Sequence, residues 1–219
     1  MYKILFFLFP WAIRRKLLNY FLKYEIHKSA KIGYAWVFPH KLIMDEGAYI
    51  GHLTVAINLD EIVMHTKSKI GRSNWITGFS TIKETKFFKH QIGRSSKLTL
   101  GKHSAITKKH HIDCTNHINI GSYATVAGYQ SQLLTHSIDV FDNRQNSDPI
   151  FIGDYTFIGT NSVILGGARL PNYSLLAAKS MLGKSFDEEW TIYGGVPAKP
   201  IGNISKDAKY FSRIEGYVY

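Results

Sequence analysis

An aliphatic residue recurs at every sixth position between residues 150 and 185. The positions are Ile152, Ile158, Ile164, Leu170, Leu176 and Leu182, and a small residue follows at Gly153, Gly159, Ala177 and Gly183. An amphipathic helix needs apolar residues three and four apart, and a half-buried strand needs them two apart, so a period of six fits neither. It is typical of a parallel β-helix, in which each short strand directs one aliphatic side chain inward before a tight turn. Because one hexad cannot bury its own apolar residue, the hexads must stack as a solenoid.

The six-residue spacing continues in weaker form through the rest of the chain. It relates Ile26 to Ile32, Ile70 and Ile76 to Ile82, and Leu100 to Ile106, Ile112 and Ile118, then restarts two residues late at Ile120 and Val126. We interpret the late restart as a slip of the kind found where a coil carries an inserted loop. The pattern predicts an all-β solenoid over residues 26–201, followed by a short helix and tail over 202–219.

Two segments interrupt the repeat. Residues 83–97 are rich in lysine and aromatic side chains and break the register, which predicts a loop or an irregular coil. Residues 137–149, SIDVFDNRQNSDP, are polar and contain no hexad. A polar loop on a repetitive scaffold is where specific chemistry is usually placed, so we expect this insertion to belong to the functional site.

Charge is concentrated at the N-terminus. The formal net charge is +11, and residues 1–31 hold seven basic residues against one acidic residue. This asymmetry does not by itself imply nucleic acid, and we expect no nucleic-acid partner. The single cysteine, Cys114, permits no internal disulfide, so nothing requires an oxidising compartment.

Residues 1–25 predict a short amphipathic helix with two alternative roles. An apolar run, Ile4–Phe9, precedes Pro10 and the basic cluster that begins at Arg14, and the run is too short to span a membrane. The helix could cap the open end of the solenoid, because terminal coils need covering. It could also lie on an anionic membrane surface, because basic residues stand beside its apolar ones.

Two stretches carry a resemblance to a known family. Residues 152–184, IGDYTFIGTNSVILGGARLPNYSLLAAKSMLGK, and residues 194–199, GGVPAK, resemble the hexapeptide-repeat acyltransferases, in particular the branch that O-acetylates sugars and polysaccharides. The resemblance implies a left-handed β-helix and a homotrimer with active sites in clefts between subunits. It also implies acetyl-CoA as the acyl donor, a histidine general base and no metal ion.

The family's motif positions indicate the candidate catalytic and substrate-binding residues. The resemblance places the base at His136, at the start of the polar insertion, with Asp113 one coil earlier helping to bind the acceptor hydroxyl. Asp139 is a local alternative for orienting the imidazole, although an aspartate there could equally stabilise a turn. His111, Arg144 and Gln145 are candidate contacts to the acceptor substrate.

The resemblance also indicates residues for coenzyme A. Gly159 and Thr160 match positions that line the pantetheine arm, and Ala178 matches a backbone contact to that arm. Lys184 and Lys199 match basic positions near the nucleotide phosphates, although exposed lysines are common for other reasons.

These observations favour an acetyl-CoA-dependent O-acetyltransferase that modifies a glycan hydroxyl, such as a capsule, O-antigen or exopolysaccharide unit, free or lipid-linked. We expect a cytoplasmic protein, with a peripheral position at the inner face of the membrane as an extension. An N-acetyltransferase acting on an amino sugar nucleotide is an alternative. A zinc-dependent, carbonic-anhydrase-like hydratase using histidines such as His110, His111 and His117, or a non-catalytic solenoid scaffold, are alternatives from other classes.

Overall fold

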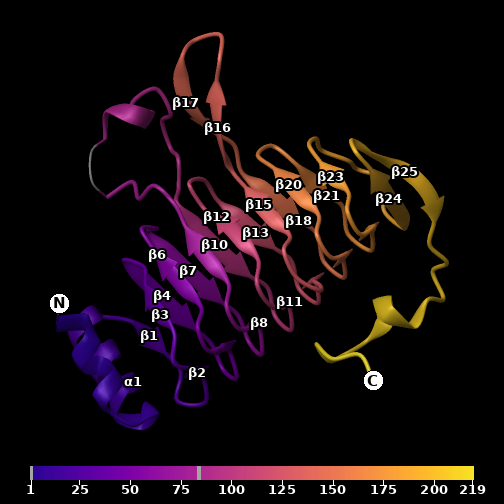
Figure 1. Ribbon diagram of the computed structural model, residues 1–219. Coiled ribbons are helices and arrows are strands. Elements are labelled where there is room, and N and C mark those ends of the chain that lie inside the picture. Colours follow the sequence, from indigo (N-terminus) through magenta and orange to yellow (C-terminus); the bar gives the residue numbers. More distant parts are fainter. Residues whose placement is uncertain (1, 83–84) are drawn as a thin grey trace.

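Each hexad forms one short strand, and three successive strands complete one coil of a left-handed parallel β-helix (Figure 1). The computed structural model describes residues 2–82 and 85–219. Sheet 1 contains β1 (Glu25–Ile26), β4 (Lys41–Met44), β7 (Glu61–Met64), β10 (Lys97–Leu100), β13 (Ile118–Ile120), β18 (Ile150–Ile152) and β21 (Arg169–Leu170). Sheet 2 contains β2 (Lys31–Ile32), β5 (Tyr49–Ile50), β8 (Lys69–Ile70), β11 (Ala105–Ile106), β14 (Thr125–Val126), β19 (Phe157–Ile158), β22 (Leu175–Leu176), β24 (Thr191–Gly195) and β25 (Ala198–Asn203). Sheet 3 contains β3 (Trp36–Phe38), β6 (Val55–Ile57), β9 (Trp75–Thr77), β12 (His111–Asp113), β15 (Gln132–Leu134), β20 (Val163–Leu165) and β23 (Met181–Leu182).

The hexad residues form the interior of the solenoid, as the sequence predicts. Paired strands set Ile152 opposite Leu170, Ile158 opposite Leu176, and Ile164 opposite Leu182. All six side chains are buried, with at most 1% exposed. Parallel coils of short strands bury their aliphatic residues only against neighbouring coils, so the whole stack shares one continuous core.

The sequence interpretation of the weaker repeat is wrong about Ile82, whereas the late restart at Ile120 is a real offset of two residues. Leu98 and Leu100 of β10 pair with Ile118 and Ile120 of β13, and all four side chains are buried. Because Leu100 pairs with Ile120, this coil is 20 residues long, two more than the coil from Ile152 to Leu170, and Ile118 is a second inward residue of the same strand. Ile82 lies outside the core and is 58% exposed, since the chain leaves the coil after β9.

The N-terminal segment covers the open end of the solenoid. A 3₁₀ helix, η1 (Tyr2–Leu8), leads into α1 (Trp11–Leu22), which lies against the first coil in Figure 1. The buried guanidinium of Arg14 donates to the carbonyl oxygens of Ile32 and Gly33, the latter at 2.8 Å, and Trp11 Nε1 donates to Ala30 O at 3.0 Å. Side chains of α1 thus satisfy carbonyls that have no coil below them. Among the described helices, none has the length and apolar character needed to cross a membrane.

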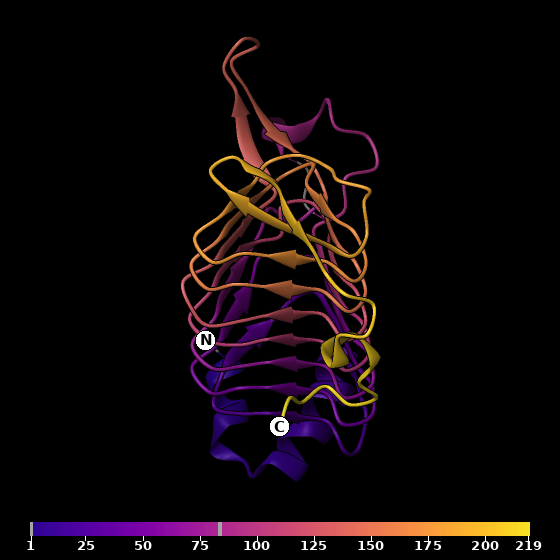
Figure 2. The same ribbon diagram turned by 90° about the vertical axis from the view of Figure 1, so that its right-hand side faces the viewer.

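The C-terminal segment returns along the outside of the coils. Strands β24 and β25 form an antiparallel hairpin that extends sheet 2. The short helix predicted within residues 202–219 is a single 3₁₀ turn, η3 (Lys209–Ser212). Figure 2 shows the tail running back from this turn across the solenoid toward earlier coils. Hydrogen bonds from Tyr210 Oη to Thr156 O, at 3.0 Å, and from Tyr123 Oη to Ile214 O, at 3.2 Å, hold it there.

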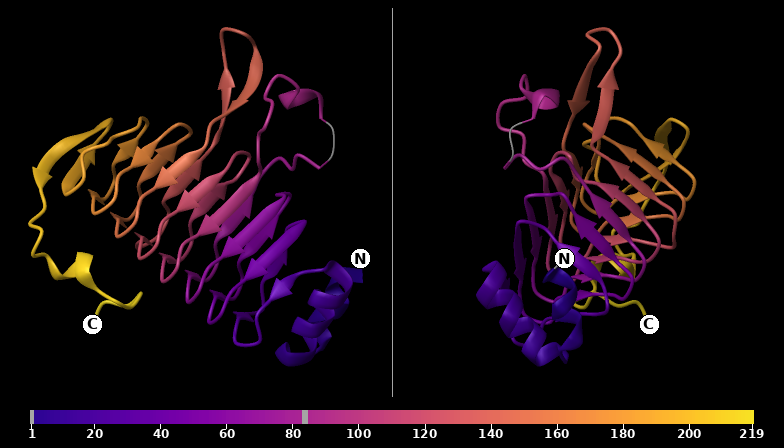
Figure 3. Two further views of the ribbon diagram at one scale, coloured as in Figure 1. Left: turned by 180° about the vertical axis from the view of Figure 1, so that it is seen from behind. Right: turned by 60° about the vertical axis from the view of Figure 1, so that its left-hand side comes forward.

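Two insertions project from the same side of the solenoid (Figures 1 and 3). The first comprises residues 78–96 and contains the 3₁₀ turn η2 (Lys86–Phe88); we call it the aromatic loop. Residues 83 and 84, which belong to the predicted irregular segment 83–97, lie outside the described residues. The second is a β-hairpin of β16 (His136–Asp139) and β17 (Arg144–Ser147), where the sequence predicts a polar loop. Both insertions follow a strand of sheet 3, so they leave the coils at the same corner.

Candidate active site

His136 stands at the base of the hairpin, where the chain leaves the coil after β15. Thr135 precedes it and is buried, with its hydroxyl donating to Asp113 O at 2.7 Å and accepting from Asn116 N. On the return side, Asp148 N donates to Thr135 O at 3.0 Å. His136 pairs with Ser147 across the hairpin, so both strands leave from one fixed point on the scaffold. A base on such a rigid root keeps its position without relying on the hairpin tip.

The imidazole of His136 lies between a carboxylate and an amide. Its Nδ1 is 3.8 Å from Asp113 Oδ2, and its Nε2 forms a hydrogen bond with Gln145 Oε1. The other carboxylate oxygen of Asp113 accepts from Thr115 N at 2.8 Å, which fixes the carboxylate on the coil below. A carboxylate beside Nδ1 favours the tautomer that carries its hydrogen on Nδ1, and this leaves Nε2 as the basic nitrogen. Turning the Gln145 amide by 180° puts its NH₂ group where Oε1 now lies, and in that orientation Gln145 donates to the unprotonated Nε2.

The aromatic loop packs against this histidine. Phe79 and Phe88 present their rings to His136 at centroid distances of 5.5 and 5.8 Å and interplanar angles of 68° and 65°. Phe88 is buried, whereas Phe79 is 42% exposed. The candidate base therefore has an apolar wall on one side and the polar hairpin on the other. Neither phenylalanine was a candidate from the sequence; the aromatic enrichment of residues 83–97 was a signal for Phe88 alone.

Polar contacts hold the aromatic loop against the coils. The carboxylate of Asp60 accepts from Ser80 Oγ at 2.5 Å and from Thr81 Oγ1 at 2.6 Å. Partial burial of Asp60 tends to raise its pKa, but these hydrogen bonds, with those from backbone N–H groups, outweigh burial and lower the pKa. On the other side of the loop, Arg94 donates to Phe79 O at 2.6 Å and lies 4.3 Å from the centroid of the Phe88 ring. Arg94 thus fixes both rings that contact His136.

A second set of contacts joins the aromatic loop to the hairpin. Gln91 Nε2 donates to Asn146 Oδ1 at 2.8 Å and to Ser147 O at 2.9 Å, and Ser147 Oγ donates back to Gln91 Oε1 at 2.7 Å. Asn116 Nδ2, from the coil, donates to the same Ser147 carbonyl at 3.1 Å. The two insertions, separate in sequence, therefore form one unit around His136. Sequence patterns gave no signal for Gln91.

Asp139 and Arg144 lie at the hairpin turn, away from the imidazole. The Asp139 carboxylate accepts from the N–H groups of Phe141 and Asp142, at 3.0 and 3.1 Å, and the hydrogen bond from Asp142 is the main cause of its lowered pKa. Arg144 Nη2 is 2.6 Å from Asp142 Oδ2, and its Nε is 3.6 Å from Asp139 Oδ2. The structure thus brings Asp113 to His136, while the geometry of Asp139 fits the turn-stabilising alternative.

His111 and Asp113 lie on the same outer face of β12, and Asp113 is two residues further along the strand. The His111 side chain is exposed, and it lines a shallow hollow of about 310 Å³ together with Lys109, Gln130 and Asn161. This hollow lies toward the corner where sheet 2 passes into sheet 3. His111 is therefore separated from His136 by the length of a sheet 3 strand, and the two could contact the same acceptor only if it spans that strand.

The residues expected to bind coenzyme A divide between two corners. Gly159 and Ala178 are stacked where sheet 2 passes into sheet 3, and a Cβ at Gly159 would lie 2.4 Å from Ala178 N. Thr160 adjoins them, with its hydroxyl donating to Tyr129 O at 3.0 Å. His136 lies instead where sheet 3 passes into sheet 1. Lys184 is at this second corner, with its Nζ 5.0 Å from the Phe186 ring, and Lys199 is exposed on β25.

Two of the histidines named for a zinc site have structural hydrogen bonds. His110 is fully buried, accepts from Ser131 N at 3.1 Å and lies 3.0 Å from Thr107 Oγ1; burial lowers its pKa to about 4, so it is neutral at pH 7. His117 Nε2 is 2.9 Å from Thr99 Oγ1. Within residues 2–82 and 85–219, no group of three or more histidine, cysteine or acidic side chains is placed to hold a metal ion.

Comparison with known proteins relates the chain to solved structures of acetyltransferases. No family model matches the chain, and no curated protein does. The polysialic acid O-acetyltransferase OatWY superposes with a TM-score of 0.64 at 14% identity, covering 87% of this chain and 90% of that one. A putative acetyltransferase of Bacillus cereus superposes at 0.50 with 19% identity, covering 87% and 84% of the two chains. A hexapeptide-repeat acetyltransferase of Vibrio cholerae is 25% identical with a TM-score of 0.47, over 50% of this chain and 64% of that one. At these identities the first two likenesses establish the fold alone.

Proposed function

We propose that this chain, which has the left-handed β-helix fold of hexapeptide-repeat acetyltransferases, is itself an O-acetyltransferase. The donor is acetyl-CoA and the acceptor is a hydroxyl group of a glycan. The observation that carries the proposal is the position of His136, with Asp113 at 3.8 Å from its Nδ1 and a hydrogen bond between its Nε2 and Gln145. This is the arrangement that a general base needs.

The proposed reaction uses His136 Nε2 as the base. The acceptor hydroxyl takes the place of the Gln145 amide at Nε2, which removes the hydroxyl proton as the oxygen attacks the thioester carbonyl. The carbon–sulfur bond then breaks, and the imidazolium returns its proton to the departing sulfur, so no acyl-enzyme forms. Asp113 stabilises the imidazolium while it carries the proton. Gln145, once displaced, is free to donate to the bound acceptor.

The two corners that hold the candidate residues suggest that a complete site needs more than one copy of the chain. Gly159, Thr160 and Ala178 present small side chains and backbone groups suited to a pantetheine arm, but on a different corner from His136. Packing of two copies in a homotrimer can bring one corner against the other. Lys184, on the same corner as His136, and the exposed Lys199 would then contact the phosphates of the donor.

The acceptor proposal draws on the surroundings of His136. Phe79 offers an exposed aromatic ring beside the base, and the hairpin offers the amide group of Gln145. An aromatic surface with a few convergent polar groups suits a sugar ring, which has apolar faces and hydroxyl edges. His111 and Arg144 would contact an acceptor only if it extends along β12 or along the hairpin, which an oligosaccharide can do.

Thiol release from acetyl-CoA, with a panel of oligosaccharides and amino sugar nucleotides as acceptors, tests this function. Acceptor-dependent release with an alkali-labile product establishes O-acetylation, because esters hydrolyse under conditions that leave amides intact. An alkali-stable product would move the assignment to the N-acetyltransferase alternative. No release with any acceptor, together with stoichiometric bound zinc, would support the hydratase, and no release without zinc would favour a scaffold.

The outer face of the N-terminal cap supports a peripheral location at the inner face of the membrane. Seven apolar side chains here are 43–74% exposed: Ile4, Leu5, Leu8, Phe9, Ile13, Tyr20 and Phe21. Exposed Lys16 and Lys23 stand among them, whereas Arg14 faces inward and Arg15 is half-buried. Apolar side chains surrounded by cations are typical of a surface that inserts at the headgroups of anionic lipids. Such a location would give a cytoplasmic enzyme access to lipid-linked acceptors.

Vesicle sedimentation tests this location. We expect the protein to bind vesicles containing phosphatidylglycerol and not vesicles of phosphatidylcholine alone. Replacing Leu5 and Leu8 by serine should weaken binding by about tenfold or more, because each exposed leucine loses roughly 1.5 kcal/mol or more of burial on insertion. The matched control replaces the exposed Ile214 and Val218 of the tail by serine. Equal binding of both double variants would contradict the proposal.

A further inference from the structure

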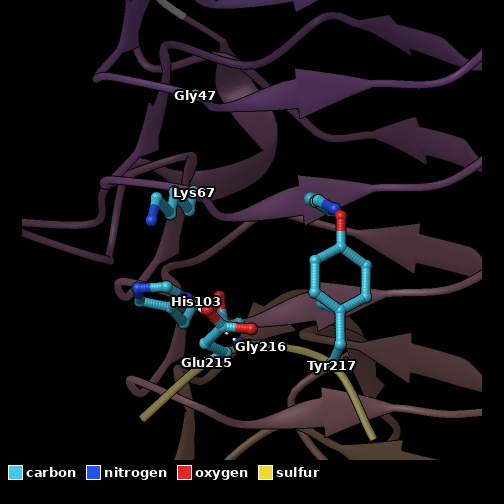
Figure 4. Close-up of a pocket in the computed structure, with 9 residues that line it drawn as sticks. Gly47, Lys67, His103, Glu215, Gly216 and Tyr217 are labelled. Atoms are coloured by element: carbon cyan, nitrogen blue, oxygen red, sulfur yellow. Dashed lines mark hydrogen bonds between the residues drawn. The ribbon is translucent and has the colours of Figure 1, made fainter. Parts of the chain in front are cut away.

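A cavity lies between the C-terminal tail and the corner where sheet 1 passes into sheet 2 (Figure 4). Its volume is about 280 Å³. Lys67 and Lys69 come from one coil and His103 from the next, while Glu215 and Tyr217 of the tail form the opposite wall. His136 lies at another corner, at the far end of a sheet 1 strand, so this cavity has no part in the proposed acyl transfer.

Positive charge predominates around the cavity. Neither Lys67 nor Lys69 has an ion pair within the described part of the chain, and Glu215 is the one acidic residue on the wall. Partial burial lowers the pKa of Lys69, and burial together with the nearby Lys67 lowers the pKa of His103. Cations gathered without matching carboxylates are stabilised when an anion joins them.

The tail fixes the tautomer of His103. Gly216 N donates to His103 Nδ1 at 3.1 Å, so the neutral ring carries its hydrogen on Nε2. The ring also stacks on Tyr123 at a centroid distance of 5.0 Å with an interplanar angle of 4°, which holds its plane. The Nε2–H group of His103 is therefore held in a fixed orientation, and the hydrogen bond from the tail leaves it free to donate. With the two ammonium groups, it makes three donors around one cavity.

The wall formed by the tail is held from outside the cavity. Arg213 donates to Tyr123 O, and Tyr123 Oη donates to Ile214 O at 3.2 Å. Beyond these anchors, the Tyr217 ring lies 3.7 Å from Lys69 Nζ, a cation–π contact. The Tyr217 ring thus gives the cavity an apolar surface directly beside one of its cations.

We propose that this cavity binds a small phosphorylated molecule. A phosphate monoester supplies several acceptor oxygens and close to two negative charges, which match two ammonium groups and one imidazole N–H. The volume exceeds what a bare phosphate needs, and the ring of Tyr217 offers a surface for a short organic group. Bound there, the ligand bridges the tail and two coils, so it stabilises the docked tail.

Isothermal titration calorimetry with inorganic phosphate and with ribose 5-phosphate tests the proposal. We expect both to bind and the ester to bind more tightly. Replacing Lys67 and Lys69 by alanine should weaken binding by about tenfold for each lost charged contact. Glu215→Gln should strengthen binding about threefold, because it removes the opposing charge at an exposed position.

The matched control replaces Lys28 and Lys31, exposed lysines of the first coil that do not line the cavity, by alanine. It removes the same charge and should bind both anions as the wild type does. Binding that falls equally in both double variants would show a response to net charge only and would overturn the assignment. No measurable binding of either anion to the wild-type protein would overturn it as well.

Discussion

His136→Ala should abolish nearly all acceptor-dependent release of thiol from acetyl-CoA. General-base catalysis contributes about 10²- to 10⁴-fold to such reactions, and we expect a loss of kcat in that range. The KM for acetyl-CoA should change little, because Gly159, Thr160 and Ala178, which we propose hold the pantetheine arm, lie on another corner of the coil. The hairpin root should survive, since Thr135 and Ser147 hold it through hydrogen bonds that do not involve the imidazole.

Two carboxylate variants separate the roles that the structure assigns around this base. Asp113→Asn should lower kcat about tenfold or more, because an amide beside Nδ1 no longer favours the imidazolium. Asp139→Asn should retain near wild-type kcat, because its carboxylate serves the hairpin turn. Circular dichroism and thermal unfolding of all variants check that the fold is intact. Full activity in His136→Ala with an intact fold would contradict the proposed mechanism.

The core of the solenoid could be predicted from the sequence because each hexad is a local signal. Ile152 and its counterparts face inward wherever a strand of one coil lies on the next. The spacing did not specify how many residues a strand directs inward. Ile118 and Ile120 are both buried because β13 matches two inward positions of β10, and only the register of the neighbouring coil reveals this.

The site could be predicted only where motif positions or local chemistry gave a signal. The resemblance pointed to His136 and Asp113, and the structure brings them together. Phe79, Phe88 and Gln91 were missed because they reach His136 and the hairpin through contacts between segments far apart in sequence. Nothing in the spacing of an irregular loop indicates which coil it will fold against.

Gly71→Ala should strongly destabilise the solenoid, because this glycine faces the backbone of the next coil. A Cβ at Gly71 would lie 1.8 Å from Thr107 O, a backbone atom of that coil. Neither layer can move easily. Gly71 O accepts from Thr54 Oγ1 at 2.8 Å, and the Thr107 hydroxyl donates to Gly128 O at 2.7 Å. Forcing the coils apart would break these hydrogen bonds and open the core beneath.

We expect Gly71→Ala to lower the free energy of unfolding by about 3 kcal/mol or more. For a chain of this length that corresponds to a fall of roughly 6–12 °C in Tm. Gly202→Ala is the matched control, because the nearest atom to its Cβ, Ile192 Cδ1, would be 3.7 Å away. That variant should stay within about 0.5 kcal/mol of the wild type.

Close stacking at the corners also explains why small residues follow the hexad aliphatics. Gly51, like Gly71, lies at a corner where a Cβ would come within 2.6 Å of the backbone of the next coil. If this close approach requires the small residue, the loss in free energy of unfolding should be larger where the Cβ would lie closer to the next coil. Gly51→Ala should then also lower the free energy of unfolding. Equal Tm values for Gly71→Ala and Gly202→Ala would show that the coils can separate at this corner without loss. The small residues of the repeat would then need another explanation than stacking.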